Sequence, residues 1–183
     1  IYDLVIAMRR KLLGPEHPDY AWSLMNSAQL QIRLGNPTKA AREAREILAL
    51  RGTAVPESHP TIAAALQILG LAMGQLDSLG LEERYLKESL ALRRKTLPKD
   101  HWLIASGEGM LGEHYVRTRQ FAKAEPLLLH SEERLLAIRG ADSPQTLDAM
   151  ARLARLYDAM GRTAEADHWR AEGGDRARSQ AGK

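Results

Sequence analysis

The sequence has no cysteine, and aromatic residues make up only 5% of it. Without cysteine there is no disulfide framework, no thiolate nucleophile and no cysteine-based zinc site. Because strands are enriched in aromatic and β-branched residues, the shortage of aromatic side chains beside plentiful Ala and Leu favours helices.

Long apolar runs are also missing. No uninterrupted apolar stretch approaches the roughly 20 residues that a membrane-spanning helix needs, and no signal-peptide pattern is visible. We therefore expect no membrane partner for these residues and a cytoplasmic location, with an upstream signal or anchor left open. The net charge of +3 is small and the basic residues are spread along the chain, so we expect no nucleic-acid partner.

What the sequence does contain is an internal repeat with a period of 42 residues. Four helix-entrance dipeptides follow at this step: His17-Pro18, His59-Pro60, His101-Trp102 and Ser143-Pro144. A column of small residues keeps the same step: Ala28, Gly70, Gly112 and Ala154. Several independent columns at one period indicate a repeat architecture.

Each unit is predicted to form two helices. The first begins at the His-Pro dipeptide, and its apolar residues fall at helical spacing, as in Leu66, Leu69 and Met73. A short turn follows, and the second helices are expected at 39–51, 82–94, 123–138 and 164–172. The small column lets the two helices of a pair approach closely. Pro126 is expected in the first turn of a second helix, where its missing N–H costs nothing.

These residues resemble the tetratricopeptide repeat. Its pattern of Leu-Gly/Ala and then Tyr in the first helix, with Ala in the second, matches Leu153-Ala154, Tyr157 and Ala166. The 42-residue period, the GPEHP entrance and the segment SLMNSAQL are similar to the longer repeats of kinesin light chains. The resemblance implies an all-α, right-handed α-α superhelix of antiparallel helix pairs, a TPR solenoid. It departs at Glu82, which stands in the alanine column and predicts a shifted turn.

The period divides the chain into the following segments. Residues 1–16 are expected to be the second helix of a truncated upstream repeat and a turn, followed by repeats at 17–58, 59–100, 101–142 and 143–172 and by a flexible tail at 173–183. Such an array is expected to be part of a larger multidomain protein.

Three features suggest chemistry, and each has a plainer interpretation. The segment GEGMLG, residues 107–112, matches a dinucleotide-binding fingerprint, but it lies within a predicted helix and lacks the required preceding strand. His17, His59 and His101 would lie roughly 10 Å apart in stacked repeats, too far for one zinc ion, so we interpret them as helix-entrance residues that cap or pack. Glu108 stands in an otherwise apolar column and is expected to tilt outward or to pair with an arginine, with a ligand contact left open.

The resemblance places function on the first helices, which line a concave peptide-binding groove. The expected groove residues are Trp22, Asn26, Gln29, Arg33, Gln67, Leu71, Met110, Glu113, Arg117, Arg152 and Arg155. Amides can hold a peptide backbone and arginines can bind carboxylates, so we predict a protein or peptide partner, possibly acidic. We expect no catalytic residue, no metal ligand and no cofactor.

Two other classes stay open. A self-associating scaffold is the first alternative, because the apolar N-terminal segment around Leu4, Val5 and Met8 could stack weakly on another copy. An enzyme is less favoured, because no nucleophile motif, phosphate-binding loop or other catalytic constellation is present in the sequence.

Overall fold

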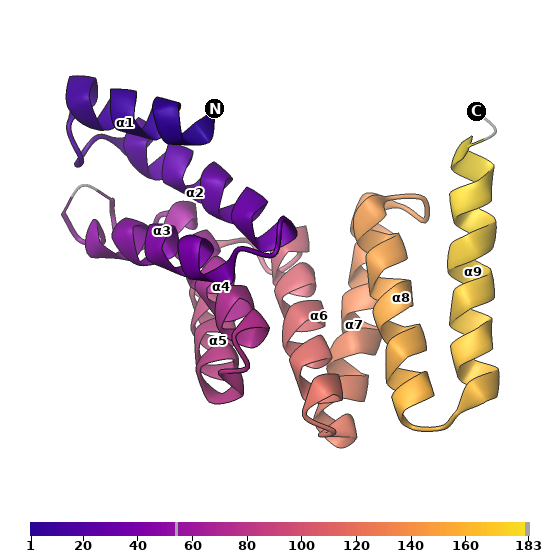
Figure 1. Cartoon of the computed structure of the whole chain (residues 1–183). Coiled ribbons are helices and arrows are strands. Elements are labelled where there is room, and N and C mark those ends of the chain that lie inside the picture. The colour runs from indigo at the N-terminus through magenta and orange to yellow at the C-terminus, as the bar shows by residue number, and fades with distance from the viewer. Residues whose placement is uncertain (54, 182–183) are drawn as a thin grey trace. The chain divides into compact units, whose positions relative to one another are not determined.

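The computed structural model describes residues 1–53 and 55–181, which form helices joined by short turns (Figure 1). The helices are α1 (Tyr2–Leu13), α2 (Pro18–Arg33), α3 (Pro37–Ala49), α4 (Pro60–Gln75), α5 (Leu79–Thr96), α6 (Trp102–Arg117), α7 (Phe121–Arg139), α8 (Pro144–Ala159) and α9 (Thr163–Ala181). They make two compact units, Ile1–Thr96 with α1 to α5 and Leu97–Lys183 with α6 to α9. The predicted all-α fold of helix pairs is confirmed.

The helix boundaries keep the 42-residue period. The first helices of the pairs, α2, α4, α6 and α8, begin at residues 18, 60, 102 and 144, and each has 16 residues. The second helices, α3, α5, α7 and α9, begin at residues 37, 79, 121 and 163. The shifted turn predicted from Glu82 is therefore wrong, because this buried glutamate stays in register with Ala40 of the first pair.

The three histidines cap the helices that they precede. His17, His59 and His101 have extended backbones, and each Nδ1 accepts a hydrogen bond at 3.2 Å from the backbone N–H two residues later. Ser143 caps the fourth entrance, where its Oγ accepts from the N–H of Thr146, three residues later. These bonds satisfy N–H groups that have no partner inside the helix. The interpretation of the histidine column as a helix entrance is confirmed.

The turn between the two helices of each pair contains one left-handed residue. This position is Gly35, Asp77, Arg119 and Gly161 in the four pairs, with φ of 70°, 55°, 57° and 74°. Glycine adopts this conformation at little cost, whereas an L side chain crowds the following carbonyl. The two turns that lack glycine are therefore strained relative to the others.

The small column lies where the helices of a pair come closest. A Cβ added to Gly112 on α6 would lie 2.7 Å from Leu128 Cγ on α7, and one added to Gly70 on α4 would lie 3.1 Å from Leu86 Cγ on α5. Ala28 fills the same position in the first pair and is fully buried. The physical reason inferred from the sequence, close approach of paired helices, therefore holds in the structure.

The core of the first unit lies between α2, α3 and α4. Leu24 and Ala28 of α2, Ile47 of α3 and Leu66 and Leu69 of α4 belong to its buried clusters. Full burial of each Leu or Ile stabilises the fold by about 1.5–3 kcal/mol, so this packing holds the three helices in register.

Two features of the second helices differ from the sequence prediction. Helix α9 does not end at residue 172 but continues to Ala181, because the Ala and Arg residues after its two glycines favour helix. Residues 182 and 183 of the predicted flexible tail lie outside the described residues. Pro126 is not in the first turn of α7, which begins at Phe121, so it removes one backbone hydrogen bond inside this helix.

Glu108 is buried rather than tilted outward. It is 4% exposed, and its Oε2 lies 2.7 Å from Nδ1 of His130 on α7. The outward orientation expected from the sequence is wrong, because position 108 lies on the face of α6 that packs against α7. The partner that α7 provides for this carboxylate is a histidine, as a buried acid requires a polar partner.

Candidate functional site

Four of the predicted groove residues form one stripe on α2. Trp22, Asn26, Gln29 and Arg33 are separated by four, three and four residues, which places them on the same face of a helix. Trp22 is 55% exposed, Gln29 and Arg33 are exposed, and Asn26 is half-buried. The opposite face of α2 is buried in the core of the first unit. We call Trp22, Asn26, Gln29 and Arg33 the α2 stripe.

Arg9, which the sequence pattern did not indicate as a site residue, contacts the Trp22 end of this stripe. The Arg9 guanidinium of α1 lies 6.0 Å from the centroid of the Trp22 ring, and its Nη1 donates to the Asp19 carbonyl at 2.9 Å and to Ser23 Oγ at 2.6 Å. Arg9 therefore fixes α1 against the start of α2 and lies against one aromatic face of Trp22.

The predicted groove residues on α4 are less exposed to solvent than those of the α2 stripe. Gln67 and Leu71 are half-buried, and the Gln67 Oε1 is covered by protein atoms and accepts no hydrogen bond within the described residues. Gln75, one turn after Leu71, donates from Nε2 to the Ile32 carbonyl at 3.1 Å and so ties the end of α4 to the end of α2. In the first unit, the α2 stripe is therefore more accessible to a partner than the α4 positions.

In the second unit the predicted site residues meet in an ionic network. Glu113 of α6 accepts from Arg152 Nε at 2.9 Å and from Arg155 Nη2 at 2.7 Å, both on α8. Arg152 also contacts Asp148 at 2.6 Å and is only 8% exposed. Both arginines that the sequence assigns to partner carboxylates are therefore paired within the unit, and Arg152 is largely inaccessible.

The network sets the charge state of Glu113. Burial alone would raise the pKa of this carboxyl, but the guanidiniums of Arg152 and Arg155 more than offset burial and hold the pKa below its usual value. Glu113 is consequently ionised at neutral pH. Its charge stabilises the two arginines and is not free to receive a cation from a partner.

The approach of Arg152 to α6 depends on a glycine. A Cβ added to Gly109 would lie 2.7 Å from Ser131 Oγ and 3.1 Å from Arg152 Nη1. Gly109 belongs to the GEGMLG segment, which lies inside α6, so this segment is helix packing and not the strand-to-helix turn of a dinucleotide site. Of the remaining predicted residues of α6, Met110 is half-buried and Arg117 is exposed.

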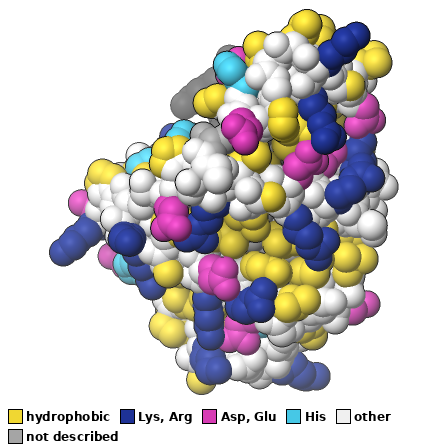
Figure 2. Space-filling view, turned by 90° about the vertical axis from the view of Figure 1, so that its left-hand side faces the viewer, with side chains coloured by type: hydrophobic (Ala, Val, Ile, Leu, Met, Phe, Trp, Pro, Cys, Tyr) yellow, Lys and Arg dark blue, Asp and Glu magenta, His cyan; other side chains and the backbone are white. Residues whose placement is uncertain are grey.

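The face of the molecule in Figure 2 carries Lys and Arg side chains interspersed with Asp and Glu around apolar areas. Among the described residues no group of three or more metal-ligating side chains is close enough to hold an ion, and no helix is sufficiently long and apolar to span a membrane.

Comparison with known proteins gives the family of these helix pairs. A tetratricopeptide repeat model matches residues 103–169, and a second tetratricopeptide repeat model matches residues 1–19. None of the curated proteins compared with the chain matches it. The helix pairs define an α-α repeat protein, and its matches over residues 103–169 and 1–19 are to tetratricopeptide repeats, as the resemblance in the sequence implied.

Solved structures with this fold include kinesin light chain repeats. A Podosopora anserina protein named for kinesin light chain, with nearly identical TPR-like repeats, has a TM-score of 0.70 at 22% identity, covering 98% of this chain and 85% of that one. BtubC (BKLC) from P. vanneervenii has a TM-score of 0.80 at 14% identity, covering 97% and 71%. MamA has a TM-score of 0.61 at 18% identity, covering 100% and 92%. At these identities the similarity is one of fold.

Proposed function

We propose that the chain is a non-enzymatic protein–protein interaction module that binds an extended or helical segment of a partner protein along the exposed face of its first helices. The α2 stripe is the observation that carries this proposal. It places an aromatic ring, two amides and an arginine on one accessible face. Tetratricopeptide repeat proteins as a class support the general role of binding protein partners.

In this proposal, the side chains of the stripe make different kinds of contact with the partner. Asn26 and Gln29 donate and accept hydrogen bonds with the partner backbone. Trp22 covers an apolar side chain with the ring face that Arg9 leaves open. Arg33, which forms no ion pair within the described residues, binds a partner carboxylate bidentately. The expected affinity is about −8 kcal/mol, a micromolar dissociation constant.

The paired arginines of the second unit contribute little to an acidic preference. Arg152 and Arg155 already share Glu113, so a partner carboxylate gains little by approaching them. Binding there would cost the internal pairing of a largely buried guanidinium. The acidic preference of the partner is therefore assigned to Arg33, and the charge balance of Arg152 and Arg155 is structural.

Selection from a random peptide display library tests the proposal for a partner of unknown sequence. Peptides are selected on the wild-type chain and measured by calorimetry against Arg33→Glu and against Arg45→Glu, a charge reversal at an exposed position of α3. We expect acidic peptides that bind about tenfold more weakly to Arg33→Glu and unchanged to Arg45→Glu. Equal affinities for both variants would remove Arg33 from the site.

Self-association is a second candidate, and the exposed face of α1 favours it. Leu4, Met8 and Leu12 follow at intervals of four residues and are 77%, 53% and 71% exposed. Two copies that pair these faces in antiparallel fashion would bury six large apolar side chains. Sedimentation equilibrium of the wild type and of Leu4→Glu/Met8→Glu tests this. A monomer at about 100 μM would exclude self-association at physiological concentrations.

A further inference from the structure

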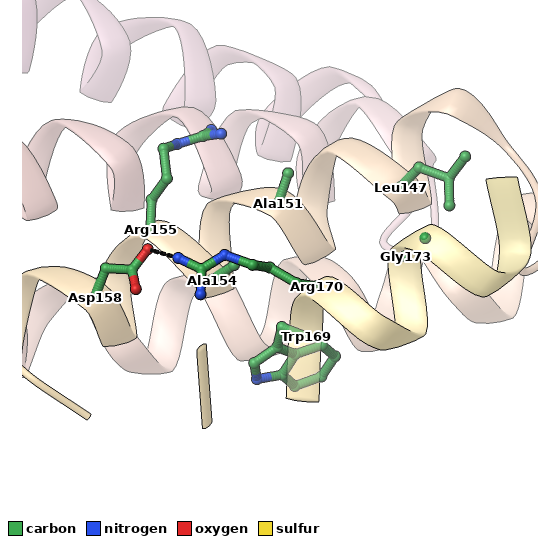
Figure 3. Close-up of a pocket in the computed structure, with 9 residues that line it drawn as sticks. Leu147, Ala151, Ala154, Arg155, Asp158, Trp169, Arg170 and Gly173 are labelled. Atoms are coloured by element: carbon green, nitrogen blue, oxygen red, sulfur yellow. Dashed lines mark hydrogen bonds and ion pairs between the residues drawn. The ribbon is translucent and has the colours of Figure 1, made fainter. Parts of the chain in front are cut away.

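Two kinds of exposed surface occur on the helix pairs. One is the broad face of a pair, such as the wall of the cavity of about 430 Å³ between α8 and α9, where Arg170 reaches across to Asp158 (Figure 3). Another helix pair can cover such a face, as α4 covers α2 and α3 in the first unit. The other kind is the edge formed by the turns inside the pairs, which neighbouring repeats leave open because they stack helix against helix.

The turn edge of the first unit exposes apolar side chains. Leu34 and Leu76 occupy equivalent positions directly after the ends of α2 and α4, and they are 61% and 42% exposed. Leu79, the first residue of α5, follows in the second of these turns and is 38% exposed. The equivalents of the first two leucines in the second unit, Thr118 and Met160, are half-buried. The exposed leucines are therefore a property of the first unit.

The two turns lie next to each other and have the same geometry. The Nε2 of Gln75 donates to the Ile32 carbonyl at 3.1 Å, which joins the last turn of α4 to the last turn of α2 just before the two leucines. Each turn is closed by a backbone hydrogen bond of 2.9 Å, donated by the N–H of Asn36 in the first and by the N–H of Ser78 in the second. A surface held in this way loses little conformational entropy on binding.

One charged residue flanks each of the two leucines. Arg33 precedes Leu34, and Asp77 follows Leu76. Both charged side chains are exposed, and neither forms an ion pair within the described residues. They lie at opposite corners of the exposed surface, because one stands before the leucine of its turn and the other after. We call Arg33, Leu34, Leu76, Asp77 and Leu79 the turn patch.

The turn patch is complementary to itself. A two-fold axis that runs between the two turns brings each turn opposite the other turn of a second copy. Leu34 then faces Leu76 of the second copy, and Arg33 faces Asp77 of the second copy. Two identical ion pairs flank an apolar centre in this arrangement. A partner of one charge sign would leave either Arg33 or Asp77 without a counter-ion, so a second copy of the chain fits the patch best.

We propose that the turn patch is a homodimer interface, with the leucines in its centre and an Arg33–Asp77 pair at each end. Interfaces that bury less than about 1,200 Å² are weak, and this patch is small, so we expect a dissociation constant of about 50 μM. Arg33 also belongs to the α2 stripe, so the dimer competes with an acidic partner segment for it. At about 10 μM the chain is mainly monomeric, which keeps tests of the stripe separate from tests of the dimer.

Charge exchange tests the interface. Sedimentation equilibrium gives the dimer dissociation constants of the wild type, of Arg33→Asp and of Asp77→Arg. Each variant places like charges opposite each other in its own dimer and is expected to dimerise at least about tenfold more weakly than the wild type. An equimolar mixture of the two variants restores both ion pairs. We expect it to form a heterodimer with a dissociation constant within about threefold of the wild-type value.

Both substitutions are compatible with the fold. Arg33 is exposed, and the equivalent of Asp77 in the third pair is Arg119, which has the same left-handed backbone, with φ of 57° against 55°. Circular dichroism verifies that the variants fold. Leu4→Glu/Met8→Glu, on the exposed face of α1, is the matched control and is expected to leave the dimer unchanged.

Three results would overturn the proposal. The first is a wild-type chain that stays monomeric at about 500 μM, ten times the expected dissociation constant. The second is a dimer that neither charge variant weakens, because the interface would then lie on another surface. The third is a pair of weakened variants that do not associate in the mixture, because Arg33 and Asp77 would then not face each other.

Discussion

The carboxylate of Glu113 lies 2.9 Å from Nε of Arg152, a residue 39 positions later on the neighbouring first helix. This contact joins α6 to α8 on the face predicted to receive a partner. Arg155 extends it at 2.7 Å. Glu113, Arg152 and Arg155, which the sequence offers for peptide binding, therefore stabilise the second unit itself. For this reason we propose the α2 stripe of the first unit as the main recognition surface.

Glu113→Gln is expected to lower the free energy of unfolding by about 1–2 kcal/mol, because it leaves the largely buried Arg152 with Asp148 alone. This loss is smaller than the loss from breaking a fully buried ion pair, because Glu113 is partly exposed. The folded pKa of Glu113 is lowered, so its contribution is present above the unfolded pKa and is lost as pH falls through the folded pKa. Urea denaturation against pH measures both effects. Glu88→Gln, which breaks the exposed pair with Arg84, is the control and should cost less than about 1 kcal/mol.

Glu43→Gln is expected to have the opposite effect at neutral pH. Burial raises the pKa of Glu43 more than the Ser27 hydrogen bond and the nearby Lys39 and Arg42 lower it. A raised folded pKa contributes stability below the unfolded pKa, and that stability is lost as pH rises through the folded pKa. The variant should therefore melt above the wild type near pH 7, with a smaller difference near pH 4. Equal melting temperatures at neutral pH would show that Glu43 is not penalised by burial.

Arg119→Gly is expected to stabilise the second unit by about 0.5–1 kcal/mol, because glycine relieves the left-handed backbone at φ 57°. Asp77→Gly should gain less, since aspartate tolerates this conformation better than arginine. Gly161→Ala, at the equivalent turn, is the opposite control and should destabilise. Guanidinium denaturation of the three variants ranks them, and a loss of stability in Arg119→Gly would contradict the account of the turn.

His59→Ala is expected to lower the free energy of unfolding by about 1 kcal/mol, because the Thr61 N–H loses its acceptor at the start of α4. His59→Asn should retain most of the stability, since an asparagine side chain can accept the same bond. Thermal denaturation compares the two. If alanine and asparagine destabilise equally, packing of the ring and not capping is the role of this histidine.

Much of the fold could be predicted because equivalent positions in the four helix pairs have the same structural role and therefore carry similar residues. The His17, His59 and His101 caps and the close approach at Gly70 and Gly112 follow from columns that recur at every 42 residues. Local hydrogen bonding and close packing are properties of one position and its immediate neighbours, so a column of similar residues reveals them.

Contacts that occur once could not be found in this way. His130 lies in no periodic column, so nothing in the sequence identified it as the partner of Glu108. The sequence pattern assigns Glu113, Arg152 and Arg155 to one face of the first helices, but it does not indicate that they bind one another. Arg119 was missed because arginine is no signal for a left-handed turn.

The central claim, that the α2 stripe binds a partner segment, is tested most directly by the dissociation constant of a display-selected peptide for the wild type and for Asn26→Ala. Asn26 is half-buried on the exposed face of α2, so the substitution removes an amide without opening the core. The account predicts a micromolar dissociation constant for the wild type and one about tenfold higher for Asn26→Ala, measured by calorimetry. An unchanged dissociation constant in Asn26→Ala and also in Trp22→Ala would contradict it.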